Sequence, residues 1–180
     1  MENTAQTKWG IDPTHSEVSF KVKHLMITNV KGVFKTFNGS VVTTGSHVPS
    51  HVEFALDTES VDTGVADRDA HLRSADFFDA ANHKQITFKS TSTQKVDDEN
   101  FVLHGELSIR GVSHPVKLDV EFSGMMKDPW GNEKAGYAIS GKINRKDWGL
   151  NWNAALEAGG VLVSDEVKLN CEVQLVRVNA

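Results

Sequence analysis

Cysteine is almost absent from this sequence, in which Cys171 is the single example. One thiol cannot close a disulfide within the chain, so the fold does not depend on an oxidising compartment. Long apolar runs are absent as well. No stretch approaches the roughly 18 consecutive apolar residues that a membrane-spanning helix needs. We therefore do not expect the chain to span a membrane.

A leader sequence and a basic cluster are also missing. Residues 1–8 contain no basic segment followed by an apolar one, which a secretory signal would require. We expect a cytoplasmic protein if the chain is complete, and a periplasmic one if a leader has been removed before residue 1. The net charge is −5, and no group of lysines and arginines is visible along the chain, which argues against nucleic acid as a partner.

The main positive signal is a strict alternation of apolar and polar residues. Such runs occupy residues 17–22, 101–110, 116–123 and 166–176. Alternation of this kind predicts β-strands that have one dry face and one wet face. Turn signals such as Asn38-Gly39 separate the runs. We count about eight strands, and the one helical stretch lies near residues 67–74.

The apolar face of these strands has to be covered, and either a sandwich or a closed barrel would cover it. Several predicted strands are about nine to eleven residues long, roughly 30 Å at ~3.3 Å per residue. Closure of the sheet removes the exposed edges that such strands would otherwise leave. We therefore predict an all-β protein with one antiparallel β-barrel of about eight strands. Residues 1–8 are expected to form a flexible tail, and residues 9–180 a single domain.

The interior of such a barrel is either packed with side chains or hollow enough for one small ligand, and this decides the function. Gly105 and Gly141 fall on the apolar faces of their strands. Their missing side chains would leave space inside, although glycine also marks bends and bulges in sheets, and both explanations can hold together.

The predicted strand that contains Ile86 and Phe88 places Ser90 and Ser92 on the same face as these two apolar residues. Two explanations are open: the interior of the barrel becomes polar at this end, or the strand leaves the barrel there.

Polar and aromatic residues near strand ends are the candidates for the mouth of a ligand site. His24 and His114 lie on the apolar faces of their strands, where they either contact a polar head group or form a local hydrogen bond. Arg68 belongs to a dense ionic cluster. It either contacts a head group or pairs with nearby carboxylates and anchors the helix. Phe34 and Trp148 either line the mouth of a pocket or plug an end of the barrel.

Residues for catalysis or metal binding are harder to find. The eight histidines form no H-x-x-x-H or H-E-x-x-H pair on a helix, so no metal site is predicted, although a set such as His15, His24 and His71 stays open. Cys171 lies on the inner face of its strand and is interpreted as a small buried hydrophobe. A G-x-S-x-G elbow is absent. We expect no catalytic residue, no metal and no cofactor.

Several motifs taken together resemble the YceI-like family. The motifs are W-G-I-D-P-T-H-S at 9–16, R-D-A-H-L-R-S-A-D-F-F-D at 68–79, G-E-L-S-I-R-G-V at 105–112, N-R-K-D-W-G-L at 144–150 and V-S-D-E-V at 163–167. The resemblance covers positions 9 to 176. It implies a lipocalin-like β-barrel that binds isoprenoids or other long-chain amphiphiles, often as a dimer, and it supplies no catalytic residues. Many relatives are exported to the periplasm. His83-Lys84 stands where relatives often have an aromatic residue and a proline.

The leading hypothesis is a homodimeric binding protein rather than an enzyme. It would bind, store or transport a long-chain amphiphilic lipid, such as an isoprenoid, a quinone-like molecule or a fatty-acid derivative, inside the barrel. The alternatives are an enzyme that acts on a small hydrophobic substrate through histidines at the mouth, and a packed structural or stress-response barrel without a ligand. The candidate ligand-binding residues are Phe20, Val22, His24, Phe34, Arg68, Leu103, Gly105, Leu107, His114, Leu118, Val120, Gly141 and Trp148.

Overall fold

A computed structural model describes residues 5–154, 156 and 162–178 of the chain, most of them in β-strands. The strands are β1 (Gln6–Ile11), β2 (Glu17–His24), β3 (Thr28–Phe34), β4 (Phe37–Thr44), β5 (Val48–Asp57), β6 (Val61–Asp62), β7 (Gln85–Lys95), β8 (Asn100–Ile109), β9 (Val112–Lys127), β10 (Glu133–Asn144) and β11 (Val163–Arg177). The helices are α1 (Ala66–Arg73) and the short 3₁₀ helices η1 (Pro13–His15), η2 (Thr58–Ser60) and η3 (Arg145–Trp148).

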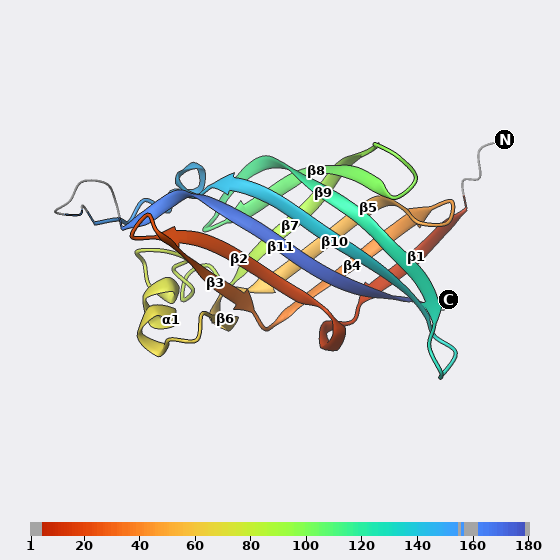
Figure 1. Cartoon of the computed structure of the whole chain (residues 1–180), viewed down its shortest axis with the longest axis horizontal. Coiled ribbons are helices and arrows are strands. Elements are labelled where there is room, and N and C mark those ends of the chain that lie inside the picture. The colour runs from red at the N-terminus through yellow and green to blue at the C-terminus, as the bar shows by residue number, and fades with distance from the viewer. Residues whose placement is uncertain (1–4, 155, 157–161, 179–180) are drawn as a thin grey trace.

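The strands close into an elongated barrel, which Figure 1 shows from the side. Within the described residues, pairing between β1 and β11 completes a ring in the order β1-β4-β5-β7-β8-β9-β10-β11. Every pairing in this ring is antiparallel. The predicted antiparallel barrel of about eight strands with one short helix near residues 67–74 is therefore confirmed.

Strand β11 pairs with two strands in succession along the same edge. Ile11 at the end of β1 lies opposite Leu175, and Glu17 at the start of β2 lies opposite Glu172. The break between β1 and β2 is the helix η1, which begins after Asp12. Beyond this break, β2 pairs with β3 and β3 with β6, so these three strands extend the sheet at one end of the ring.

Asp12 organises this break through hydrogen bonds from three residues. Its Oδ1 accepts from the backbone nitrogen of Thr14 at 3.0 Å, and its Oδ2 lies 2.9 Å from Nδ1 of His15 and 3.0 Å from Nζ of Lys134. Hydrogen bonds from His15, Thr14 and Lys134 hold the pKa of the Asp12 carboxyl well below its usual range. Asp12 is therefore charged at neutral pH and ties the break to strand β10.

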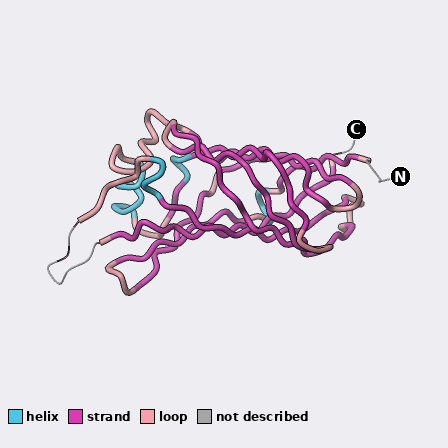
Figure 2. Tube along the Cα trace, turned by 90° about the horizontal axis from the view of Figure 1, so that it is seen from above, coloured by secondary structure: helices cyan, strands magenta, loops and turns pink. Residues whose placement is uncertain are grey.

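Helix α1 covers the end of the barrel at which β2 and β3 diverge from the ring (Figures 1 and 2). The Asp69 carboxylate accepts from the backbone nitrogen of Thr63 at 2.8 Å and from its hydroxyl at 2.6 Å. Arg73 donates to the carbonyl oxygens of Glu59 at 2.9 Å and Val61 at 3.1 Å. These bonds fasten the helix to the segment that follows β5. Among the described residues, no helix has the length and hydropathy required to cross a lipid bilayer.

Side chains pack densely at the opposite end of the barrel. Trp9 and Thr43 are almost inaccessible there, and Nε1 of Trp9 donates to Oγ1 of Thr43 at 2.9 Å. Phe101 and Leu175, each 1% exposed, belong to the same cluster. A second cluster, which includes Trp148, lies toward α1. The ring is therefore packed with side chains at the end away from the helix.

Two local expectations were wrong. Gln6 to Lys8, assigned to the flexible tail, are in β1 and pair with β4. Asn38-Gly39 is not a turn but lies inside β4. Of the two explanations for Ser90 and Ser92, an inward-facing Ser92 does not hold, because a register shift between these residues breaks the alternation in β7 and leaves Ser92 exposed.

Glycines on the inner face make room for neighbouring side chains. A Cβ at Gly105 would lie 2.5 Å from Cζ of Phe88, and one at Gly141 would lie 2.7 Å from Cδ2 of Leu118. The space that these glycines leave is therefore filled by a ring and by a leucine from the neighbouring strands. The β7 irregularity also falls opposite Gly105, so the explanation that glycine marks a bulge holds there.

Replacement of Gly105 by alanine should lower the free energy of unfolding by about 2 kcal/mol, a cost typical of overpacking a core. The new Cβ would lie 2.4 Å from the carbonyl oxygen of Lys89, so backbone as well as the Phe88 ring would have to move. Gly10→Ala is the matched control, because nothing lies within 4 Å of a Cβ there. Urea denaturation measures both variants. Equal stability losses would show that Gly105 is not required for this close approach.

Candidate ligand-binding cavity

A cavity of about 540 Å³ occupies the barrel interior between the packed end and helix α1. Aliphatic and aromatic side chains from every strand of the ring form most of its wall. The wall includes Ile11, Val18, Phe20, Val22, Val30, Phe34, Val41, Val52, Phe54, Leu56, Ile86, Phe88, Leu103, Leu107, Ile109, Val116, Leu118, Ile139, Ile143, Val167, Leu169, Cys171, Val173 and Leu175. Its volume lies in the range of ordinary small-molecule sites.

The cavity is long rather than round. Along β11 its wall includes residues from Val163 to Leu175, which is most of the length of that strand. Inward-facing side chains such as Leu107, Leu118 and Leu169 are only partly buried, although they point away from the outer surface. They keep accessible area because they face this hollow. An extended apolar chain fits such a shape.

Polar side chains gather at the α1 end of the cavity. His24 at the end of β2, Thr63 after β6, and Asp67, Arg68 and His71 on α1 all line this end. The other end is closed by the cluster around Trp9. The cavity therefore has an apolar bottom and a polar mouth.

Arg68 is held at the mouth by neutral partners. Its Nε donates to Oγ1 of Thr63 at 2.7 Å, and its Nη2 donates to the carbonyl oxygen of Thr63 at 2.8 Å. Among the ion pairs of the described residues, none includes Arg68. The expectation that it pairs with carboxylates was wrong, although it does anchor the helix. The guanidinium thus brings a positive charge to the cavity wall, and none of the carboxylates that the structure describes contacts it directly.

His71 joins the helix to the segment that follows η3. Its Nε2 lies 2.9 Å from Oδ2 of Asp76. Its ring meets the rings of Trp152 and Phe77 edge-on, at centroid distances of 4.6 Å and 5.0 Å. These aromatic contacts connect two sides of the mouth. The histidine–carboxylate pair joins α1 to the turn that follows it, outside any strand, so the alternation of the strands gave no sign of it.

Arg145 shapes the other side of the mouth. Its guanidinium, 3% exposed, donates to the carbonyl oxygens of Leu150 at 2.6 Å, Trp152 at 2.8 Å and Ser164 at 3.0 Å. Leu150 and Trp152 follow η3, and Ser164 lies in β11. The Arg145 side chain therefore binds both ends of the connection between η3 and β11. Burial lowers the pKa of Arg145, and the Asp165 carboxylate opposes that shift. This role accounts for the arginine of the N-R-K-D-W-G-L motif.

The structure divides the predicted ligand-binding residues into two groups. Those that line the cavity are Phe20, Val22, His24, Phe34, Arg68, Leu103, Leu107 and Leu118. Those that do not line it are Gly105, His114, Val120, Gly141 and Trp148. Trp148 is 2% exposed and donates Nε1 to the carbonyl oxygen of Leu107 at 2.8 Å, so it plugs the barrel. His114 packs edge-on against the Trp148 ring at 5.4 Å, and Val120 belongs to the packed end.

Some wall residues were missed although the alternation of β11 and β10 contained the signal. Val167 and Leu169 share the inner face of β11 with Cys171, and Ile139 and Ile143 share that of β10. Trp152 also lines the cavity, and alternation could not indicate it because it lies outside any strand.

Cys171 lines the cavity as a neutral thiol. Burial raises its pKa to about 11, so the reactive thiolate is scarce at neutral pH. This agrees with its interpretation as a small hydrophobe. Within the described residues, no group of three or more His, Cys, Asp or Glu side chains is arranged to hold a metal ion.

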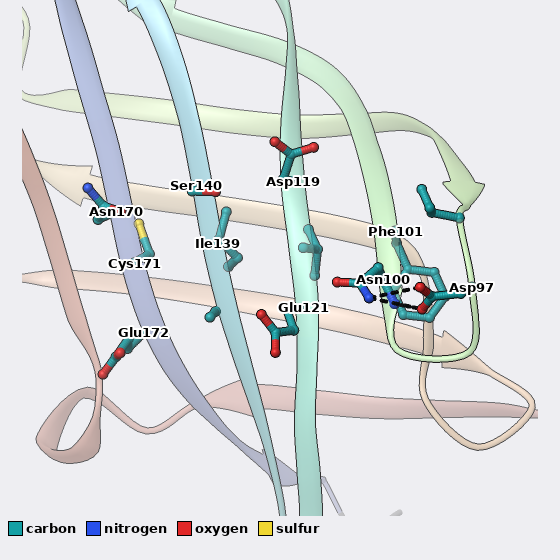
Figure 3. A pocket seen from close by; sticks show the side chains of 13 residues that line it. Asp97, Asn100, Phe101, Asp119, Glu121, Ile139, Ser140, Asn170, Cys171 and Glu172 are labelled. Atoms are coloured by element: carbon teal, nitrogen blue, oxygen red, sulfur yellow. Dashed lines mark hydrogen bonds between the residues drawn. The ribbon is translucent and has the colours of Figure 1, made fainter.

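A second depression, of about 450 Å³, lies on the outside of the barrel over β9, β10 and β11. Figure 3 shows Asp119 and Glu121 on β9, Ser140 on β10 and Glu172 on β11. The carboxylates of Asp119 and Glu121 come from β9 and that of Glu172 from β11, and they do not converge on a common point. The depression is open to solvent and shares no mouth residue with the interior cavity.

A closed antiparallel barrel with an elongated apolar cavity and a polar mouth defines a lipocalin-like protein. The YceI-like domain family matches residues 9–175. A UPF0312 protein of Staphylococcus epidermidis is 38% identical over 179 residues, which cover 93% of this chain and 96% of that protein. The chain therefore belongs to the YceI-like family.

Solved structures agree with this assignment. The YceI protein of Campylobacter jejuni has a TM-score of 0.77 and 34% identity, with coverage of 93% of this chain and 96% of that one. A polyisoprenoid binding domain from Saccharophagus degradans has a TM-score of 0.68 and 16% identity, with coverage of 94% and 98%. At 16% identity, the likeness to the polyisoprenoid binding domain shows a shared fold and nothing more.

Arg145→Gln should lower the free energy of unfolding by about 3 kcal/mol, because several buried carbonyl oxygens would lose a charged donor. Lys146→Gln is the control: its side chain is 51% exposed and reaches Asp165 at 3.4 Å, so its loss should cost little. Urea unfolding followed by tryptophan fluorescence compares the two. A small effect at Arg145 would contradict its assignment as the clamp of this connection.

Proposed function

We propose that this protein binds one long-chain amphiphilic lipid, such as an isoprenoid, a quinone-like molecule or a fatty-acid derivative, and stores or transports it. The observation that carries the proposal is the long apolar cavity of about 540 Å³ with polar side chains at one end. The fold shared with a polyisoprenoid binding domain adds support. A fully packed structural barrel does not agree with a cavity of this size.

Affinity would come mainly from the tail. Each methylene group removed from water contributes about 0.8 kcal/mol. The wall offers aliphatic side chains along its whole length and few hydrogen-bonding groups below the mouth. Discrimination between tails would therefore depend on length and branching rather than on particular polar contacts.

The head group would lie beside α1. Arg68 and His24 are the side chains we assign to it, because both line the mouth and neither forms an ion pair among the described residues. His114 was a third candidate in the sequence, but it does not line the cavity and is left out. Arg68 would favour a head group that carries a carboxylate, a phosphate or a carbonyl oxygen.

An enzyme on the same scaffold is the second candidate. The His71–Asp76 pair at 2.9 Å favours it, since a carboxylate can orient a histidine for acid–base work. The hydrogen bonds of the described residues bring no hydroxyl or thiol to the His71 ring. The family resemblance implies binding rather than catalysis, and we propose binding as the function. The homodimer and the cellular compartment stay predictions.

Val167→Phe should reduce lipid uptake at least tenfold, because the larger ring projects into the cavity and displaces several methylene groups of the ligand. Val96→Phe is the matched control, since Val96 is 62% exposed and lies outside the cavity. Native mass spectrometry of delipidated protein, incubated with a polyprenol or a long-chain fatty acid, gives the stoichiometry. Equal uptake by both variants, or a clean apo mass for the wild type with every lipid, would overturn the proposal.

A further inference from the structure

The hairpin between β2 and β3 ends in three large apolar residues that face solvent. Leu25, Met26 and Ile27 are 42%, 55% and 79% exposed. The turn is tight, since the nitrogen of Ile27 donates to the carbonyl oxygen of His24 at 3.3 Å. We call these three residues the apolar tip. Figure 1 shows this hairpin at the same end of the barrel as α1, and residues of α1 line the cavity mouth.

The backbone of the apolar tip is as unusual as its exposure. Leu25 and Met26 have φ values of 54° and 63°, the left-handed region that favours glycine and asparagine. Hairpin turns with two such residues usually contain Asn-Gly or Asp-Gly. Bulky apolar residues here are unfavourable for the backbone and unfavourable in water. Such an outlier points to a function that needs the apolar side chains.

A row of lysines lies behind the apolar tip on the outer face of the barrel. Lys31 on β3 is opposite Lys21 on β2, Lys21 is opposite Lys168 on β11, and Lys168 is opposite Lys142 on β10. All four are exposed. We call them the lysine row. Like charges directly opposite each other destabilise a sheet, so the row is not explained by the fold.

The lysine row stands out because the chain as a whole carries a net charge of −5. Lys23, also exposed, adds a further cation between the row and the apolar tip. Two acidic residues border the row: Glu17, which lies 2.8 Å from Nζ of Lys31, and Glu166 on β11. The remaining members have no ion pair among the described residues. This patch is therefore a positive surface on an acidic protein.

The spacing between the two features fits the depth of a lipid head-group layer. Lys23 is two residues and Lys21 four residues before Leu25, which are strand distances of about 7 Å and 13 Å at ~3.3 Å per residue. Peripheral segments insert apolar side chains about 5–10 Å into the boundary between head groups and acyl chains. With the apolar tip at that depth, the lysines lie level with the phosphates.

We propose that the α1 end of the barrel docks on an anionic lipid bilayer through the apolar tip and the lysine row. Val22, Val30 and His24, from the same hairpin, line the cavity, so docking places the cavity mouth against the bilayer. A second copy of this chain fits the surface less well. In a two-fold contact the same patch meets itself, and lysines would face lysines. Docking stands independently of the bound ligand, whereas delivery of a ligand rests on the proposed function.

Flotation with vesicles tests the docking directly. The wild type should float with vesicles of phosphatidylcholine and phosphatidylglycerol, and should stay at the bottom with phosphatidylcholine alone. Lys168→Glu should weaken binding more than about fivefold, the effect of removing one lysine near an anionic surface, and salt should weaken it further. Lys127→Glu, at the opposite end of the barrel, makes the same change in net charge and should bind as the wild type does.

Two tip variants test the apolar part. Met26→Asn suits the left-handed backbone and keeps the fold, and Ile27→Ser removes the most exposed of the three side chains; both should reduce flotation at least tenfold. Met126→Ser is the matched control, since Met126 is 78% exposed at the far end of β9. The proposal is overturned if no vesicle binds the wild type, or if tip and control variants bind equally.

Sedimentation of the same proteins without vesicles tests whether a second copy of the chain, and not a bilayer, covers the apolar tip. Dissociation of a dimer by Met26→Asn would assign the apolar tip to a second copy and overturn the membrane proposal. Lipid uptake measured by native mass spectrometry, in the absence of vesicles, separates the two ideas. A protein that takes up lipid normally but does not float would contradict the docking proposal and leave lipid binding intact. A protein that floats but takes up no lipid would contradict lipid binding and leave docking intact.

Discussion

The pairing of one strand, β11, with two strands in succession is the constraint on which the rest of the structure depends. Where β11 pairs with β1, the ring closes and side chains such as Trp9 and Leu175 fill it. Where β11 pairs with β2, the sheet branches toward β3 and β6, and the ring is open to α1. Asp12, charged and bonded to Lys134, sits at the change from one partner to the other. The cavity, its mouth and its bottom all follow from this single break.

The space beside the inward-facing glycines is not itself the hollow, because neighbouring rings fill it. Gly32 and Gly105 are covered by the rings of Phe20 and Phe88, whose nearest atoms would lie within 2.6 Å of a Cβ added at either glycine. These glycines allow large side chains to lie flat against the sheet, and a ring that lies flat takes less of the interior than one that points across it. The barrel keeps its cavity because its large residues are pressed against the wall. Large rings and an open interior are thus compatible.

Much of the fold was predictable from the sequence, because the alternation of apolar and polar residues indicates which segments are strands with one buried face. The same alternation identified cavity residues such as Leu103 and Leu107. It failed for features that depend on register or on packing between elements. Asn38-Gly39 has the composition of a turn but lies in β4, where Gly39 allows close packing against Ile11. The lysine row joins residues that are far apart in the sequence, so no window along the chain contains it.

The position of the mouth matters because of the energy of moving a long tail through water. Exposing about ten methylene groups costs about 8 kcal/mol at ~0.8 kcal/mol each. Since about 1.4 kcal/mol corresponds to a factor of ten in rate, such a step would be slowed by nearly a millionfold. A tail that leaves the cavity beside α1 avoids this barrier only if the apolar surface that receives it is already in contact with the mouth. An exposed apolar tip on the hairpin that also supplies Val22 and Val30 to the cavity wall places such a contact where the tail would emerge. If the protein binds a lipid and docks as we propose, the unfavourable turn at Leu25 and Met26 is the local cost of a shorter path for the ligand.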